Sequence, residues 1–267
     1  MTSAPAWCAL RENADQRARD PRLARRLAGR FIDTPTIRIL DLAAGTGANL
    51  RALAPLLGEM QEWTLVDNSP PLLEEAAFRI TEWADEARAV GDCLVLSKGD
   101  RHIGVSFRIA EPARAFETLL AQQPDLVTAH PMAEMASPLW AKRFAKAISE
   151  AGASLFCPLI EDGTGRFAPA HPLDAPLSGL GNGPASAARA AEILGAALRA
   201  KGFAVETARS PWRLGAGDAT LIAAILDRMA EAARAATPEE RATWRAFHGK
   251  GLQSLVIGHD DLFAYPG

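Results

Sequence analysis

"LDLAAGTGANL", residues 40–50, ends an apolar run and carries two glycines one residue apart. A loop of this kind between a strand and a helix offers free backbone amides to a ligand. The dinucleotide-binding pattern G-x-G-x-x-G needs a third glycine, but Leu50 occupies that place. The phosphate-binding pattern G-x-x-x-x-G-K-S/T is absent. The stretch therefore predicts a strand, a tight loop and a helix, and it supports neither phosphate-binding pattern.

Apolar runs alternate with helical patterns over most of the chain. Five runs are expected to be strands, at 34–43, 62–70, 103–112, 124–131 and 153–161. An amphipathic helix is expected at 71–90, and a small hairpin or loop at 91–102. Such alternation predicts an α/β fold, in which helices cover both faces of a parallel sheet. Two further strands are expected at 203–214 and 253–266.

The residues around the loop follow the pattern acid-x-small-x-Gly-x-Gly, with Asp41, Ala43, Gly45 and Gly47. This pattern resembles motif I of the class I S-adenosylmethionine-dependent methyltransferases, in particular uncharacterised bacterial ones. Asp67 ends the second strand, where that family holds two ribose hydroxyls, and a carboxylate is a suitable acceptor for them. The resemblance implies a doubly wound, mostly parallel sheet of seven strands with the last strand antiparallel. It also implies S-adenosylmethionine as methyl donor, with S-adenosylhomocysteine as product.

The charge of Asp41 separates two classes of cofactor. A carboxylate beside the loop attracts the cationic sulfonium and amino groups of S-adenosylmethionine, and it repels a pyrophosphate. Ligands of such sheets bind beyond the carboxyl ends of the strands. The expected cofactor-binding residues are Arg11, Asp41, Ala43, Gly45, Thr46, Gly47, Asn49, Asp67, Asn68, Ala110, Glu111, Thr128 and Ala129. Arg11 is expected to bind the donor's carboxylate, and Ala110 and Glu111 are expected to hold the adenine.

The fourth strand ends in His130-Pro131-Met132, at the position that faces the methyl group in this family. Enzymes that methylate amino groups of nucleobases commonly carry Asn/Asp-Pro-Pro-aromatic there, so the sequence disfavours a nucleobase as acceptor. Imidazole titrates near neutral pH, which makes His130 the candidate general base. Two interpretations stay open: His130 takes a proton from the acceptor, or it only packs at the strand end.

The chain is expected to form one domain over residues 1–267. Within it we expect a helical cap at 1–34, a lid-like loop at 161–184 and a helical insertion at 218–249. Residues 161–184 are rich in Gly and Pro and show no periodicity, which is typical of a functional loop. The side chains of this loop expected to bind an anionic or aromatic small molecule are Arg166, Phe167, His171 and Asp174.

Composition narrows the function further. The 267 residues carry a formal net charge of −3, and this weak acidic balance argues against a nucleic-acid partner. The three cysteines are far apart, which indicates a reducing, cytoplasmic compartment. No side chains stand at metal-ligand spacing, so no metal is expected. No segment is long enough to cross a bilayer, so no membrane partner is expected either.

The leading hypothesis is methyl transfer from S-adenosylmethionine to an oxygen or nitrogen of a small molecule. One alternative is a protein that binds S-adenosylmethionine without catalysis. Another is an NAD(P)-dependent oxidoreductase, which the missing third glycine disfavours. Methylation of nucleic acid or protein is opposed by the charge and by the residues after the fourth strand. The sequence carries no signal for the acceptor's identity or for the oligomeric state.

Overall fold

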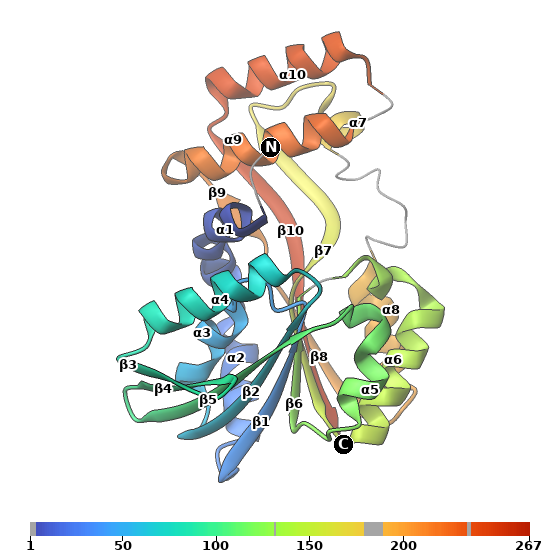
Figure 1. Ribbon diagram of the computed structural model, residues 1–267. Coiled ribbons are helices and arrows are strands. Elements are labelled where there is room, and N and C mark those ends of the chain that lie inside the picture. The colour runs from blue at the N-terminus through green and yellow to red at the C-terminus, as the bar shows by residue number, and fades with distance from the viewer. Residues whose placement is uncertain (1–3, 131, 179–188, 234–235) are drawn as a thin grey trace.

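The computed structural model describes residues 4–130, 132–178, 189–233 and 236–267, without the side chain of Ala133 (Figure 1). A ten-stranded sheet crosses it in the order β3-β4-β5-β2-β1-β6-β7-β10-β8, with β9 paired to β10. The strands are β1 (Thr36–Leu42), β2 (Met60–Asp67), β3 (Glu86–Val90), β4 (Cys93–Lys98), β5 (Arg101–Ile109), β6 (Leu126–Ala129), β7 (Ser154–Ala168), β8 (Phe203–Arg209), β9 (Trp212–Leu214) and β10 (Ser254–Pro266).

The centre of the sheet is parallel and its last strand is antiparallel. β1 runs parallel to β2 and β6, β2 runs parallel to β5, and β6 runs parallel to β7. β10 lies antiparallel between β7 and β8. All four residues of β6 are buried, because helices cover both faces of a parallel sheet. The predicted α/β class, parallel centre and antiparallel last strand are confirmed.

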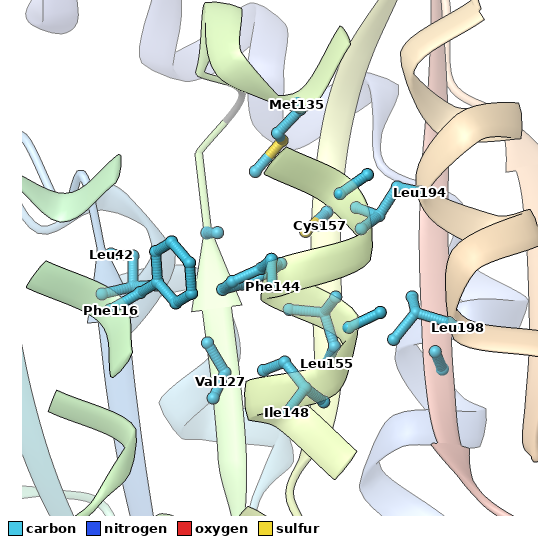
Figure 2. Packing of buried hydrophobic residues seen from close by; sticks show 14 of the residues in the cluster. Leu42, Phe116, Val127, Met135, Phe144, Ile148, Leu155, Cys157, Leu194 and Leu198 are labelled. Atoms are coloured by element: carbon cyan, nitrogen blue, oxygen red, sulfur yellow. The ribbon is translucent and has the colours of Figure 1, made fainter. Parts of the chain in front are cut away.

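Helices form a layer on each face. One layer holds α5 (Pro112–Leu120), α6 (Pro138–Ala151) and α8 (Ala190–Arg199), and the other holds α2 (Pro21–Arg30), α3 (Ala48–Leu53), α4 (Pro70–Trp83) and the 3-10 turn η1 (Ala54–Leu56). Figure 2 shows the first layer, where Phe144 of α6 lies between Phe116 and the side chains of α8. The Phe116 and Phe144 rings pack edge to face, with their centroids 5.2 Å apart. These contacts fix the helices against β6 and β7.

A third hydrophobic cluster lies beyond one end of the sheet, at the top of Figure 1. It joins β9 and the outer ends of β7 and β10 to four helices. The helices are α1 (Ala4–Ala18), α7 (Asp174–Ser178), α9 (Ala219–Ala232) and α10 (Pro238–Gly251). The 3-10 turn η4 (Ala216–Asp218) leads into α9, whereas the 3-10 turn η2 (Ala133–Ala136) packs with α6 and α8 through Met135. We call α1, α7, α9, α10, β9 and these strand ends the cap.

The sheet has ten strands where seven were predicted. The helix expected at 71–90 ends at Trp83, and Glu86–Val90 instead forms β3, paired with β4 in a hairpin. Every residue of β3 is exposed at the sheet edge, so no apolar alternation marks it as a strand. The sixth expected strand is divided into β8 and β9 around Pro211.

The loop expected at 161–184 is a strand in its first third. β7 continues to Ala168 and pairs with β10, with Phe167 opposite Leu255 and Ala168 opposite Ser254. The partner strand is about ninety residues further along the chain, so local Gly and Pro content could not reveal the pairing. α7 begins at Asp174, and residues 179–184 lie outside the described part of the chain.

Candidate cofactor site at the glycine loop

The glycine loop joins the end of β1 to the start of α3. Ala43, Gly45 and Gly47 have φ angles of 54°, 54° and 75°, a conformation that glycine adopts at little cost. A Cβ at Gly47 would lie 2.7 Å from Cδ1 of Ile80, so α4 packs directly against that residue. A Cβ at Gly45 would have only Sγ of Cys8 within 4 Å, at 3.8 Å. Helix α4 therefore packs against the loop at Gly47, and helix α1 lies next to the loop at Gly45.

Asp41 lies in β1 and has no exposed surface. Its Oδ1 accepts hydrogen bonds from Nδ2 of Asn49 at 3.0 Å and from Oγ1 of Thr128 at 2.5 Å. Its Oδ2 is buried and has no hydrogen-bond partner among the described residues. Burial raises the pKa of Asp41 to about 6, although both hydrogen bonds act to lower it. Oδ2 of Asp41 is thus able to accept a hydrogen bond from a ligand.

Arg19 brings a positive charge to the same place. Its Nη2 donates to Oδ1 of Asn49 at 2.7 Å, while its Nε and Nη1 are buried without a partner in the described structure. Burial lowers the pKa of Arg19, yet a guanidinium stays protonated at any physiological pH. An unpaired cation and an unpaired carboxylate oxygen therefore lie at opposite ends of the Asn49 amide.

Asn49 and Thr128 act on the site through Asp41. Both were expected to contact the cofactor, and both have fully buried side chains. The Asn49 amide is engaged at both ends, and the Thr128 hydroxyl donates to Asp41. We therefore correct their expected role from ligand contact to positioning of the two charges. Thr46 behaves differently, because its Oγ1 is buried without a partner among the described residues.

Asp67 lies at the end of β2 and reaches across to the glycine loop. Its Oδ2 accepts the Gly45 N–H at 2.9 Å, and its Oδ1 accepts the Ser69 N–H at 3.0 Å. Each carboxylate oxygen has two acceptor sites, so one remains on each oxygen. The carboxylate is thereby held in a fixed orientation with capacity for two further donors, as two vicinal hydroxyls would require.

The expected adenine contacts lie next to Asp67. The Ala110 N–H already donates to the Asp67 carbonyl at 3.0 Å, so this amide is not a free donor for a ligand. Oε2 of Glu111 accepts from Nδ2 of Asn68 at 2.8 Å. Oε1 of Glu111 has no such bond, so it is the atom of this group that would accept an exocyclic amine. Ala129 contributes only backbone, because its side chain packs in the layer shown in Figure 2.

His130 follows β6, and its N–H donates to the Leu42 carbonyl at 3.1 Å. Burial lowers the pKa of His130 well below 6.5, and the charges of Arg11 and Arg19 act in the same direction. The imidazole is therefore neutral at pH 7, and burial together with the two arginine charges disfavours its protonated form. Pro131, the next residue of the expected motif, lies outside the described part of the chain.

α1 covers the glycine loop and is tied to it by charges. Glu12 accepts from Nε and Nη2 of Arg51 at 3.0 and 2.6 Å, and Nη1 of Arg51 donates to the Thr46 carbonyl at 2.7 Å. Arg79 of α4 adds a second ion pair with Glu12 at 3.6 Å. One carboxylate on α1 therefore links the helix to both α3 and α4.

Arg11 is committed elsewhere, which corrects its expected role toward the donor's carboxylate. Its Nε donates to Asp15 at 2.9 Å, and its guanidinium lies 5.2 Å from the ring centre of Trp212. Trp212 in turn donates to Asp15 at 2.9 Å. Arg19, which the sequence prediction missed, has the free N–H groups instead. The sequence holds a signal for it, because Arg11, Asp15 and Arg19 recur at every fourth residue along one helical face.

The four expected substrate residues do not lie together. Arg166 is exposed, whereas Phe167 is 5% exposed and packs against Trp244 of α10, because successive residues of a strand point to opposite faces. Asp174 accepts hydrogen bonds from Trp244 at 2.8 Å and from Nε2 of His248 at 2.6 Å. Phe167 and Asp174 therefore stabilise the cap, and the prediction that they bind substrate is corrected.

His171 belongs to the same part of the cap. Its N–H donates to Asp174 at 2.7 Å, and its Nδ1 accepts from the Leu173 N–H at 3.1 Å. Its ring lies 4.8 Å from that of Phe247. The hydrogen bonds fix the turn before α7, so Arg166 is the one of the four whose charged group is free in the described structure.

No three His, Cys, Asp or Glu side chains in the described part of the chain are grouped so as to hold a metal ion. Nor does any helix within it have the length and apolar content that crossing a membrane requires.

Comparison with known proteins gives weak likenesses. No protein-family model matches the sequence. A non-reducing polyketide synthase of Hypocrea jecorina is 39% identical over 62 residues, which is 22% of this chain and 2% of that protein. Among solved structures, a methyltransferase from Thiobacillus denitrificans in complex with S-adenosylhomocysteine gives a TM-score of 0.47 at 15% identity, covering 92% of each chain.

Two further solved structures carry the names of different reactions. A precorrin-6y methyltransferase from Geobacter metallireducens has a TM-score of 0.43 at 12% identity, with 91% of this chain and 86% of that one covered. A cyclopropane synthase from Mycobacterium tuberculosis has a TM-score of 0.44 at 12% identity, with 91% and 83% covered. By the order and direction of its strands, the chain has a doubly wound, mostly parallel sheet whose last strand is antiparallel, as the sequence resemblance implies.

Proposed function

We propose that the protein binds S-adenosylmethionine at the glycine loop and transfers its methyl group to an oxygen or nitrogen of a small molecule. One observation carries the proposal. Among the described residues, a buried carboxylate oxygen of Asp41 and two buried nitrogens of Arg19 lack partners at the two ends of the Asn49 amide. Buried polar atoms without partners are costly, so a ligand that satisfies them is strongly favoured. An amino acid carries the two complementary charges.

The donor fits the other groups of the site as well. The ammonium of its methionine part would pair with Asp41 and its carboxylate with Arg19. The two ribose hydroxyls would donate to the free acceptor sites of Asp67, and the adenine amine would donate to Glu111. A dinucleotide fits less well, because its pyrophosphate would meet the buried carboxylate of Asp41.

His130 is the candidate proton acceptor of the proposed site, and its lowered pKa makes it a weaker base than a free imidazole. When bound, S-adenosylmethionine supplies an electrophilic methyl group. The neutral imidazole of His130 would take the proton that an acceptor hydroxyl or amine loses as the new bond forms. The groups around the loop would hold donor and acceptor in line and exclude water, and such alignment supplies much of the rate of a two-substrate reaction.

The amino-acid part of this proposal can be tested apart from the nucleoside part. Arg19→Gln is expected to weaken binding of S-adenosylhomocysteine by about tenfold or more, since it removes a charged hydrogen-bonding partner. The same change is expected to leave the affinity for methylthioadenosine unaltered, because that ligand lacks the amino-acid group. Calorimetry with both ligands measures the difference, and Arg11→Gln is the matched control. Equal losses for both ligands would contradict the placement of the donor.

The role of His130 is tested by turnover. His130→Ala is expected to lower the rate of methyl transfer over a pool of candidate acceptors by about 100-fold or more, and to change donor affinity little. Equal rates in the two proteins would reduce His130 to a packing residue. Donor binding with no methylated product from the unaltered protein would favour the non-catalytic alternative.

A further inference from the structure

A groove of about 830 Å³ lies between the end of α1, the start of α2 and the outer strands β7, β9 and β10. Five arginines line it: Arg17, Arg19, Arg166, Arg209 and Arg213. The single acidic residue in its lining is Asp20, whose carboxylate caps α2 by accepting from two backbone N–H groups. A groove of this size is in the range of small-molecule sites, and its lining is strongly basic although the chain is acidic.

Two of the five arginines have no partner. Arg17 is paired with Asp218, and Arg209 is paired with Asp162 and Asp260. Arg166 and Arg213 make no hydrogen bond or ion pair within the described part of the chain, and both are exposed. These two guanidinium groups are therefore the exposed uncompensated charges of the groove, and Arg19, whose Nε and Nη1 are buried without a partner among the described residues, adds a third.

The sheet places Arg166 and Arg213 in one row. Val256 of β10 is opposite Arg166 of β7 on one side and opposite Arg213 of β9 on the other. Residues in such a row point to the same face of the sheet, with Cα atoms of the outer pair about 10 Å apart. Two like charges held side by side without acids repel each other, and an anion between them removes that repulsion.

We propose that this groove binds a small acidic molecule through Arg166 and Arg213, and that this molecule is the methyl acceptor. Carboxylate and phosphate groups share the paired anionic oxygens that a guanidinium recognises with two parallel hydrogen bonds. Two free arginines suit a ligand that carries at least two such charges. The identification as acceptor depends on the proposed methyltransferase function, whereas the binding of the anion does not.

Arg19 connects the groove to the glycine loop. It lines the groove, and its Nη2 donates to Asn49, which in turn donates to Asp41. The groove and the proposed donor site are thus separated by one side chain. An acceptor anchored at Arg166 and Arg213 would lie on the groove side of Arg19, with the proposed donor on the Asn49 side.

The test is calorimetric titration of the full chain with citrate and, separately, with inorganic pyrophosphate. We expect saturable binding of at least one anion to one site, weakened about tenfold or more in the double variant Arg166→Gln/Arg213→Gln. Arg88→Gln/Arg114→Gln removes the same charge from exposed arginines of β3 and α5 and is expected to bind as the unaltered protein does. The preferred anion shows whether the ligand class is a polycarboxylate or a phosphate ester.

Several results would overturn the proposal. These are no binding of either anion, equal loss in both double variants, or tight binding of a single-stranded oligonucleotide in place of both small anions. Affinity for S-adenosylhomocysteine is measured on the same proteins and is expected to be unchanged in the groove variant. Failure of the unaltered protein to bind S-adenosylhomocysteine would refute the proposed function and leave the anion result standing.

Discussion

At the scale of single residues, Asp41 is the buried carboxylate of the proposed donor site. It is a fully buried acid whose pKa is raised to about 6 by burial, although two hydrogen bonds oppose the shift. Because its folded pKa exceeds the unfolded value of about 3.9, ionising it costs stability. The free energy of unfolding contributed by Asp41 therefore decreases as pH rises from about 4 to about 6, and is constant above that range. A bound ammonium would offset this cost.

This shift predicts a pH dependence of donor binding. If the ionised carboxylate pairs with the donor's ammonium, the affinity for S-adenosylhomocysteine falls as pH drops below about 6, by up to about tenfold per pH unit. Titration of the Kd by calorimetry between about pH 5 and pH 8 measures it. In Asp41→Asn the affinity is expected to be lower and to vary less over this interval. A Kd that is constant across the interval in the unaltered protein would contradict the pairing.

The sequence identified one charge of the site and missed the other. Asp41 and Asp67 could be predicted because each stands at a fixed distance from a local feature, the glycine loop or a strand end. Arg19 follows a helix that has no motif, and only the packing of α1 on the loop brings it to Asn49. Arg11 was predicted in its place because the N-terminal segment covers the site in the family that the sequence resembles, but in the structure Arg11 pairs with Asp15.

At the scale of elements, the cap contains helices that local sequence patterns predict and a strand end that they do not predict. The helices at 219–232 and 238–251 carry clear periodic patterns, and Thr237 with Glu240 forms a capping box at the start of α10. The outer end of β7 carries no such pattern. Its strand character depends on β10, which supplies its hydrogen-bonding partners from the end of the chain. Local composition therefore predicted a loop there.

Asp174 tests whether the cap is held as described. Asp174→Ala removes the acceptor of Trp244 Nε1 and of His248 Nε2, and both rings are almost fully buried. We expect the free energy of unfolding to fall by about 1–3 kcal/mol for each donor left without a partner. Chemical denaturation measures the change.

A matched control lies on the neighbouring helix pair. Asp227 of α9 pairs with Arg245 of α10, and the carboxylate of Asp227 is largely exposed. Asp227→Ala is expected to cost about 1 kcal/mol or less, since exposed ion pairs contribute little. If the two variants lost equal stability, Asp174 would not be the buried link between α7 and α10. The conclusion that Asp174 stabilises the cap and does not bind substrate would then be wrong.

At the scale of the whole molecule, the fold followed from alternation of strand and helix. The central parallel strands carry runs of buried apolar residues and their helices are amphipathic, so pattern alone predicts the two covered faces of the sheet. β3 and β4 add an exposed hairpin at one edge, and the cap adds a third core at the end of the sheet. The position of the cap over the glycine loop depends on long-range contacts, chiefly Glu12 with Arg51 and Arg79.

Calorimetry of the full chain with S-adenosylmethionine and with NADH, alongside Asp67→Ala, tests whether the glycine loop and its buried charges bind S-adenosylmethionine. We expect one saturable site for S-adenosylmethionine and no binding of NADH. We also expect loss of the site in Asp67→Ala while circular dichroism shows an intact fold. Binding of NADH in place of S-adenosylmethionine, or unchanged affinity in Asp67→Ala, would contradict the proposed binding.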